Sequence, residues 1–163
     1  MVNVAGIGMV RPVEYASMKE VREIFEVNFF GMVQLTQTLL PLIRLSRAGR
    51  IVNQSSRLGS LTLHSTRGSD MDSLKPFAYD TSKAAINSFT VHLAYALRDT
   101  PIKVNSAHPG VVKTDLNAVV PRDENSAPML DTVTAAKTAV QLATLPSNGP
   151  TGGFFHFGDR LPW

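Results

Sequence analysis

The chain has 163 residues, of which 44% are apolar and 18% charged, and its net charge of +3 is spread along the sequence. This composition is typical of one globular domain over residues 1–163, and the absence of a Lys/Arg run argues against nucleic-acid binding. There is no cysteine, which excludes disulfides and thiolate metal sites, and we expect no metal. Neither a signal-peptide pattern nor the roughly 18 apolar residues of a membrane helix is present, so we expect a cytoplasmic protein without membrane contact.

The N-terminal part is expected to form a strand and two helices. Residues 1–8 are a short apolar run that ends in Ala5-Gly6-Ile7-Gly8, which is typical of a strand that opens into a glycine loop. Ser17, with Glu20 three residues later, predicts a capping box at the start of a helix. A second helix over residues 28–46 is apolar on more than one face, which indicates burial on two sides.

The middle of the chain alternates strands with one long helix. A strand over residues 51–56 ends in two serines, and the polar stretch 62–76 is expected to be a surface excursion. A helix over residues 77–98 follows. The next strand covers residues 102–107 and leads into Pro109-Gly110.

The C-terminal part repeats the same alternation. Residues 115–130 show no pattern, residues 131–145 are helical, and residues 152–157 read as a last strand. Strands that alternate with helices in this way are typical of βαβ units. The pattern therefore predicts an α/β fold with about four parallel strands and helices on both faces of the sheet.

A phenol and an ammonium stand four residues apart at the head of the long helix. Tyr79 and Lys83 therefore lie one above the other on the same helical face. A nearby ammonium favours the phenolate, so we expect the pKa of Tyr79 to fall toward working pH. Such a tyrosine can serve as a general acid or base.

The predicted topology gathers polar groups at one rim of the sheet. Ligands bind beyond the carboxyl ends of the strands in an open parallel sheet. The expected strands end close to Gly6, Ser56 and Gly110, and Tyr79 and Lys83 begin the helix after the second of them. Serine, tyrosine and lysine are therefore expected to meet at this rim. The histidines show no ligand-like spacing, and we interpret them as structural or surface residues.

Taken in order, these motifs resemble those of the short-chain dehydrogenase/reductase family. Asn3-Val4-Ala5-Gly6 is similar to the family's Asn-Asn-Ala-Gly motif, and Asn28 to the asparagine of its catalytic tetrad. Tyr79 and Lys83 fit Tyr-x-x-x-Lys. Ser56 resembles the catalytic serine and is preferred to Ser55 because a glycine follows it three residues later.

The resemblance extends to the C-terminal part, where Pro109-Gly110 and Thr114 fit the family's Pro-Gly motif and its threonine. It implies the C-terminal part of a Rossmann-like, doubly wound parallel sheet that begins at the family's fourth strand. The glycine-rich turn that cradles the cofactor pyrophosphate in the family is not found in this sequence. We therefore expect a partial domain that lacks the nucleotide-binding half.

The resemblance also implies hydride transfer between a nicotinamide cofactor and a small carbonyl or alcohol substrate. Tyr79 would exchange the proton, and Ser56 would stabilise the charge on the substrate oxygen. Lys83 would lower the pKa of Tyr79 and bind the nicotinamide ribose, and Asn28 would hold a water that relays protons. The cofactor would be NAD or NADP, with NADP slightly favoured. The residues implied to bind it are Asn3, Ala5, Gly6, Tyr79, Lys83, Pro109, Gly110, Val112 and Thr114.

Oligomerisation offers an alternative to catalysis. In the resembling family, helices equivalent to 28–46 and 77–98 commonly form a four-helix interface, and their apolar patterning here permits a homodimer or homotetramer. A non-catalytic chain that only dimerises is therefore a second interpretation. A dimer that ignored nucleotide and carbonyl compounds would favour it.

Overall fold

The computed structural model of the chain describes residues 1–68, 71, 75–118, 126 and 128–163. One mixed sheet contains the strands, in the spatial order β1-β2-β3-β4-β5. The strands are Val2–Asn3 (β1), Arg50–Gln54 (β2), Lys103–Ala107 (β3), Gly153–His156 (β4) and Asp159–Arg160 (β5). The α-helices are Met18–Phe25 (α1), Gly31–Arg44 (α2), Leu61–Ser65 (α3), Phe77–Ala96 (α4) and Thr132–Ala143 (α5).

The first four strands run parallel, which confirms the predicted α/β architecture. Beyond them, β5 pairs antiparallel with β4 through a tight turn at Phe157 and Gly158, both of which have positive φ. This short strand was not predicted from the sequence. The first strand is shorter than predicted, because its pairing with β2 covers only Val2 and Asn3.

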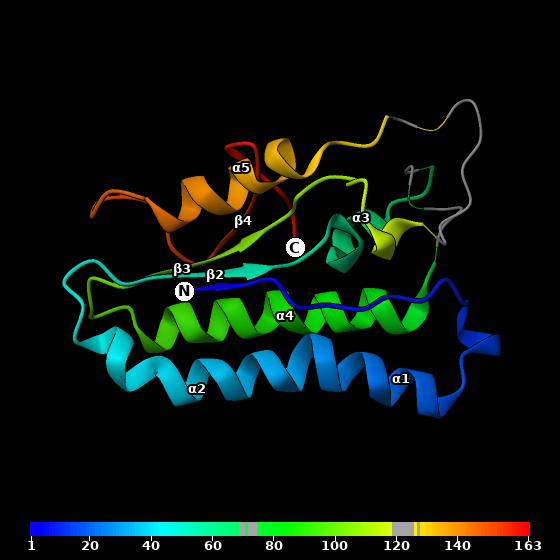
Figure 1. The fold of residues 1–163 in the computed structure, drawn as a ribbon, viewed down its shortest axis with the longest axis horizontal. Coiled ribbons are helices and arrows are strands. Elements are labelled where there is room, and N and C mark those ends of the chain that lie inside the picture. Colours follow the sequence, from blue (N-terminus) through cyan, green and yellow to red (C-terminus); the bar gives the residue numbers. More distant parts are fainter. Residues whose placement is uncertain (69–70, 72–74, 119–125, 127) are drawn as a thin grey trace.

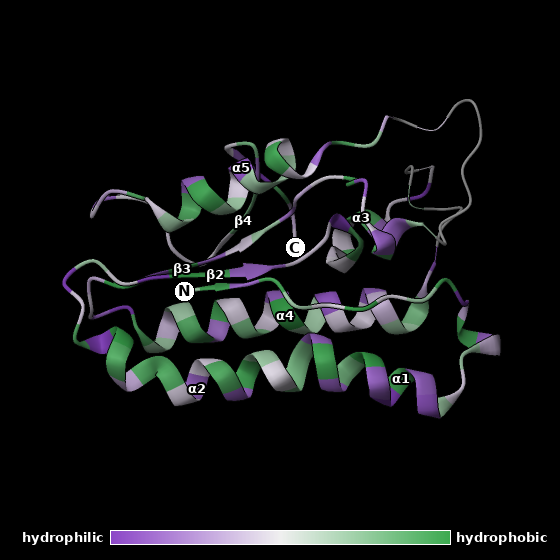
Figure 2. Cartoon of the chain, in the orientation of Figure 1, coloured by the Kyte–Doolittle hydropathy of each residue, from purple (hydrophilic) through white to green (hydrophobic). Residues whose placement is uncertain are grey.

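Helices cover both faces of the sheet (Figure 1). The helices α1, α2 and α4 lie on one side of the sheet, and α5 lies on the other. Both α2 and α4 contact the sheet, since Leu40 and Ile43 of α2 pack against the cluster around Ile51 and the Thr36 hydroxyl accepts a hydrogen bond from Asn3. Figure 2 shows hydrophobic residues along much of α2 and α5. Among the described residues, no helix has the length and apolar character needed to cross a membrane.

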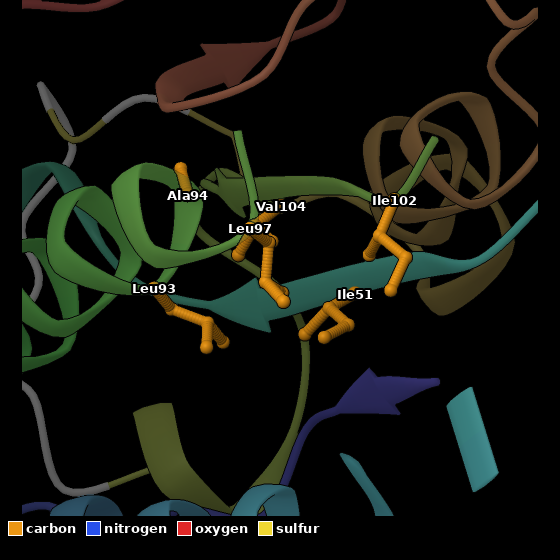
Figure 3. Packing of buried hydrophobic residues seen from close by; sticks show 6 residues of the cluster. All are labelled: Ile51, Leu93, Ala94, Leu97, Ile102 and Val104. Atoms are coloured by element: carbon orange, nitrogen blue, oxygen red, sulfur yellow. The ribbon is translucent and has the colours of Figure 1, made fainter. Parts of the chain in front are cut away.

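Two apolar clusters hold these layers together. Adjacent residues of a strand point to opposite faces, so Ile51 packs toward α4 while Val52 packs toward α5. Figure 3 shows the cluster between α4 and the sheet, which consists of Ile51, Leu93, Ala94, Leu97, Ile102 and Val104. The cluster on the other face is smaller and consists of Val52, Ala107, Leu142 and Phe155.

The capping box at α1 is confirmed. The Ser17 hydroxyl accepts from the Glu20 N–H at 3.2 Å, and the Glu20 carboxylate accepts from the Ser17 N–H at 3.0 Å. The helix that begins at this capping box and the helix predicted over residues 28–46 are not separate, however. A π-helical turn at Glu26–Phe30 (η2) joins α1 to α2 without a break. The polar stretch predicted to be irregular also contains α3. This helix is too short to produce a helical pattern of apolar residues in the sequence.

Candidate active site

The carboxyl ends of β2 and β3 and the start of α4 meet at one rim of the sheet. Ser56 follows β2 by two residues, and Tyr79 and Lys83 lie in the first two turns of α4. Pro109 and Gly110 follow the end of β3 by two and three residues. The structure thus brings together the serine, tyrosine and lysine that are far apart in sequence.

Lys83 points from α4 toward the end of β2 and is only 3% exposed. Its Nζ donates to the Gln54 carbonyl oxygen at 3.0 Å and lies 5.4 Å from the centroid of the Tyr79 ring. Burial lowers the pKa of Lys83 to about 8, because the charged form loses hydration. An ammonium carries three donors, so two remain beyond the one that Gln54 accepts. Lys83 can therefore bind the hydroxyls of a ligand.

The expected fall in the pKa of Tyr79 is wrong. Burial raises the pKa of this phenol to about 12, a hydrogen-bonding interaction with the Ser56 side chain opposes the rise, and the charge of Asp80 adds to it. The prediction considered Lys83 alone, whereas burial disfavours the phenolate more strongly. At neutral pH the Tyr79 hydroxyl therefore keeps its proton and can donate it.

The two serines after β2 have different surroundings. The Ser55 hydroxyl is buried and donates to the Lys83 carbonyl oxygen at 3.3 Å, so it is used to hold α4. The Ser56 hydroxyl accepts from the Leu58 N–H at 3.2 Å and interacts with Tyr79. Of the two, Ser56 faces the phenol. Its placement agrees with the choice made from the spacing to Gly59.

Asn28 holds the glycine loop that follows β1. It is fully buried in the π-helical turn, where its Oδ1 accepts from the Ile7 N–H at 2.8 Å. Its Nδ2 donates to the Ile7 carbonyl at 2.9 Å and to the Ser82 hydroxyl at 3.0 Å. The side chain thus pairs with the backbone of Ile7 as a neighbouring strand would. Because both amide hydrogens are used, a bound water would have to donate to an oxygen of Asn28.

Gly6 leaves room beside the lysine. A Cβ at this position would lie 3.4 Å from Lys83 Nζ and 3.5 Å from Asn28 Oδ1, so the loop passes close to both without a side chain of its own. Ala5 precedes it and is exposed. Because Gly6 has no side chain, a ligand such as a nicotinamide ribose could approach the backbone closely beside Lys83 and Asn28.

Asn3 has a different place from the one predicted. Its Nδ2 donates to Asn53 Oδ1 at 2.8 Å and to the Thr36 hydroxyl at 3.2 Å. Asn53 in turn donates to the Thr90 hydroxyl at 2.9 Å, and so does Ser106. These groups form a buried polar row that crosses β1, β2 and β3 and ties α2 and α4 to the sheet. Asn3 therefore supports the sheet rather than lining the rim.

The segment after β3 is shaped by Gly110, which has a φ of +86°. Any other residue would be strained at this φ, and a Cβ there would lie 2.7 Å from Leu130 Cδ1, so the tip of that side chain would also have to shift. The Val112 side chain is buried and its backbone bridges to Leu130, whereas Thr114 is exposed. Of these predicted cofactor residues, Val112 can offer only its backbone to a ligand.

An acidic side chain beside the tyrosine, Asp80, was not among the residues predicted from the sequence. The Asp80 carboxylate lies 3.2 Å from His64 Nε2 and its side chain is only 12% exposed. Its second oxygen, Oδ1, is buried and has no hydrogen-bond partner among the described residues. Burial raises the pKa of Asp80 to about 8, although the charge of Lys75 opposes the rise.

Replacing Asp80 by asparagine should stabilise the protein at alkaline pH. The folded pKa of about 8 lies above the unfolded value of about 3.9, so folding stability falls as the pH rises between these values. The neutral amide avoids this loss, which we expect to amount to about 1–3 kcal/mol of unfolding free energy. Urea unfolding at about pH 5 and about pH 9 measures the difference. Asp99→Asn, at an exposed position, is the control. If Asp80→Asn were less stable than the unmodified protein at about pH 9, the attraction between Asp80 and His64 would outweigh the cost of burying the carboxylate.

Comparison with known proteins agrees with the observed fold. The family model described as short chain dehydrogenase matches residues 1–125. The chain is 31% identical over 168 residues to (+)-neomenthol dehydrogenase of Capsicum annuum, a match that covers 83% of this chain and 51% of that protein. It is 32% identical over 169 residues to salutaridine reductase of Papaver bracteatum, covering 82% and 50%. The chain thus spans about half the length of the curated relatives it matches.

Solved structures give the same result. The carbonyl reductase Sniffer of D. melanogaster superposes with a TM-score of 0.80 at 28% identity, over 99% of this chain and 65% of that one. The NADPH-bound carbonyl reductase from chicken fatty liver shares the fold with a TM-score of 0.81 at 23% identity, over 99% and 64%. The chain belongs to the short-chain dehydrogenase/reductase family.

Proposed function

We propose that this chain carries the catalytic residues of an NAD(P)-dependent oxidoreductase that interconverts a small carbonyl compound and its alcohol. The observation that carries the proposal is the meeting of Tyr79, Lys83 and Ser56 at one rim. The phenol interacts with the Ser56 side chain, and the ammonium lies 5.4 Å from the phenol ring. One proton donor, one hydroxyl and one cation are the groups that carbonyl reduction needs.

The nicotinamide cofactor would be held by Lys83, by the backbone around Ala5 and Gly6, and by the loop at Pro109-Gly110. The fit rests on the uncrowded backbone at Gly6 and on the donors that Lys83 keeps. When bound, the cofactor supplies or accepts the hydride. Either NAD or NADP would be compatible with these residues.

In carbonyl reduction, the Tyr79 hydroxyl gives its proton to the substrate oxygen as the carbonyl carbon gains a hydride. The Ser56 hydroxyl donates a hydrogen bond to the same oxygen while negative charge develops on it. The phenolate that remains is stabilised by the Lys83 ammonium and regains its proton from solvent. Alcohol oxidation uses the same groups in reverse. A pKa of about 12 for Tyr79 suits the reductive direction, since the phenol is protonated at neutral pH.

Alanine substitutions at two serines test the proposal. Ser56→Ala should lower kcat for carbonyl reduction by about 10²–10³-fold, because it removes an oxyanion donor. Ser147→Ala, at an exposed position after α5, is the control and should change kcat little. NADPH consumption with a panel of aldehydes and ketones gives the rate, and NADPH fluorescence gives cofactor binding. Equal rates for the two variants, or no turnover by the unmodified chain, would contradict the proposal.

We also propose that the layer formed by α2 and α4 is a homodimer or homotetramer interface. Large apolar side chains on this layer are exposed, among them Leu42 at 65% and Tyr95 at 67%. Tyr95→Glu should therefore shift the protein toward monomers in light scattering. Val133→Glu on α5, at a position 75% exposed, is the control and should leave the mass unchanged. An oligomer without any response to nucleotide would instead favour a non-catalytic dimerising module.

A further inference from the structure

His108 connects the carboxyl ends of adjacent strands. It is the first residue after β3 and is buried. Its Nδ1 lies 3.3 Å from the backbone nitrogen of Arg57, which follows Ser56 in the turn after β2. Its own N–H donates to the Phe155 carbonyl at 2.8 Å, and its carbonyl lies 2.9 Å from His156 Nδ1. One residue thus links β2, β3 and β4 at the rim.

The partners of the two histidines fix their tautomers. The Arg57 N–H can only donate, so Nδ1 of His108 accepts and its proton is on Nε2. The His108 carbonyl can only accept, so His156 carries a proton on Nδ1. The two rings lie 4.7 Å apart, centroid to centroid. A second proton on His108 would place a donor against the Arg57 N–H.

The surroundings of His108 keep it neutral. Burial and the nearby charges of His156 and Arg57 lower its pKa to about 3. The Arg57 N–H begins the short helix Arg57–Gly59, and the first N–H groups of a helix have no partner within it. His108 supplies that partner. Without it, Ser56 and the turn after it would keep the bonds made within the turn, from the Leu58 N–H to the Ser56 hydroxyl and from the Gly59 N–H to the Ser56 carbonyl oxygen.

We propose that His108 is a positioning residue that sets the place of Ser56 relative to the Pro109-Gly110 loop. This proposal rests on the proposed function, in which Ser56 contacts the substrate oxygen. The next residue, Pro109, begins the loop proposed to contact the cofactor. The hydrogen bond from Arg57 to His108 therefore fixes the distance between the two sides of the site. An acceptor at Nδ1, rather than an aromatic ring, is what this role requires.

Two substitutions separate positioning from packing. In His108→Asn the side-chain oxygen takes the place of Nδ1 on Cγ, so the acceptor is kept and the ring is lost. In His108→Phe the ring is kept and the acceptor is lost. Each variant is assayed for kcat and KM in NADPH-dependent carbonyl reduction, for NADPH binding, and for hydrogen exchange of the Arg57 amide by NMR.

We expect His108→Phe to lower kcat by about tenfold to 10²-fold with little change in KM. The Arg57 amide should exchange about fivefold faster in that variant, since its hydrogen-bond acceptor is gone. His108→Asn should retain kcat within a few-fold and the slow exchange of Arg57. The reverse order, with phenylalanine close to the unmodified protein and asparagine impaired, would overturn the proposal in favour of packing.

The exchange measurement keeps this proposal distinct from the proposed function. If the unmodified chain shows no turnover, the oxidoreductase proposal fails, while the Arg57 exchange rates still decide whether His108 holds the turn. Unchanged Arg57 exchange in His108→Phe would overturn the positioning role even if turnover fell. Faster exchange with unchanged kcat would overturn it as well, because the turn would then move without consequence for Ser56.

Discussion

Tyr79→Phe is expected to lower carbonyl reduction by about 10²–10⁴-fold while leaving the fold intact. The substitution removes only the hydroxyl, which interacts with Ser56 and is the sole proton donor proposed for the substrate oxygen. We do not expect Lys83 to replace it, because its Nζ donates to the Gln54 carbonyl oxygen and lies 5.4 Å from the centroid of the Tyr79 ring. The loss should appear in kcat, since the interaction develops in the transition state.

A matched control for this prediction is Tyr15→Phe. Tyr15 lies in the short helix Val13–Tyr15 and is 74% exposed, so its hydroxyl should contribute nothing to the rate. Thermal unfolding and NADPH titration of both variants show whether fold and cofactor binding are retained. If Tyr79→Phe reduced carbonyl compounds as fast as Tyr15→Phe, another group would have to supply the proton.

The periodic parts of the fold could be predicted from sequence, because they follow side-chain patterns. The apolar stripe of α4 and the capping box of α1 give their helices, and the predicted ranges differ from the observed ones by a few residues at the ends. The π-helical turn at Glu26–Phe30 has no such pattern. It shifts the backbone hydrogen bonds by one residue, and tertiary contacts such as those of Asn28 with Ile7 stabilise it.

The site was predictable in its composition but not in its electrostatics. Motif spacing placed Ser56, Tyr79 and Lys83 at one rim, where the structure has them. The pKa of Tyr79 depends instead on burial and on Asp80, whose proximity to His64 arises from a helical turn within an apparently irregular stretch. Desolvation is a property of the folded chain, so helical spacing alone gave the wrong sign.

The residues of the buried polar row give a sequence signal from which the place of Asn3 can be predicted. Asn53 and Ser106 are fully buried polar residues, and each is the fourth residue of its strand. Polar side chains on a buried face require partners, which predicts a neighbouring polar group such as Asn3 in the adjacent strand. The motif resemblance implies that Asn3 binds the cofactor, whereas the burial of Asn53 and Ser106 predicts that Asn3 lies within the sheet.

Gly59→Ala is expected to displace Lys83, the lysine proposed for catalysis, as well as to destabilise the fold. A Cβ on Gly59 would lie 2.6 Å from the backbone carbon of Lys83 and 2.8 Å from its carbonyl oxygen. The clash is with helix backbone, which cannot rotate away as a side chain could, so α4 must move from the end of β2. We expect a loss of about 1–3 kcal/mol in unfolding free energy, measured by urea unfolding.

Gly158→Ala separates these two effects. Gly158 has a φ of +93°, and a Cβ added there would have no neighbour within 4 Å, so alanine adds backbone strain of about 1–2 kcal/mol without a clash. Both variants should therefore lose stability, but only Gly59→Ala should also lose NADPH binding and carbonyl reduction under conditions where the protein stays folded. Equal activity in the two folded variants would show that α4 tolerates the added methyl, and that the close approach at Gly59 does not set the position of Lys83.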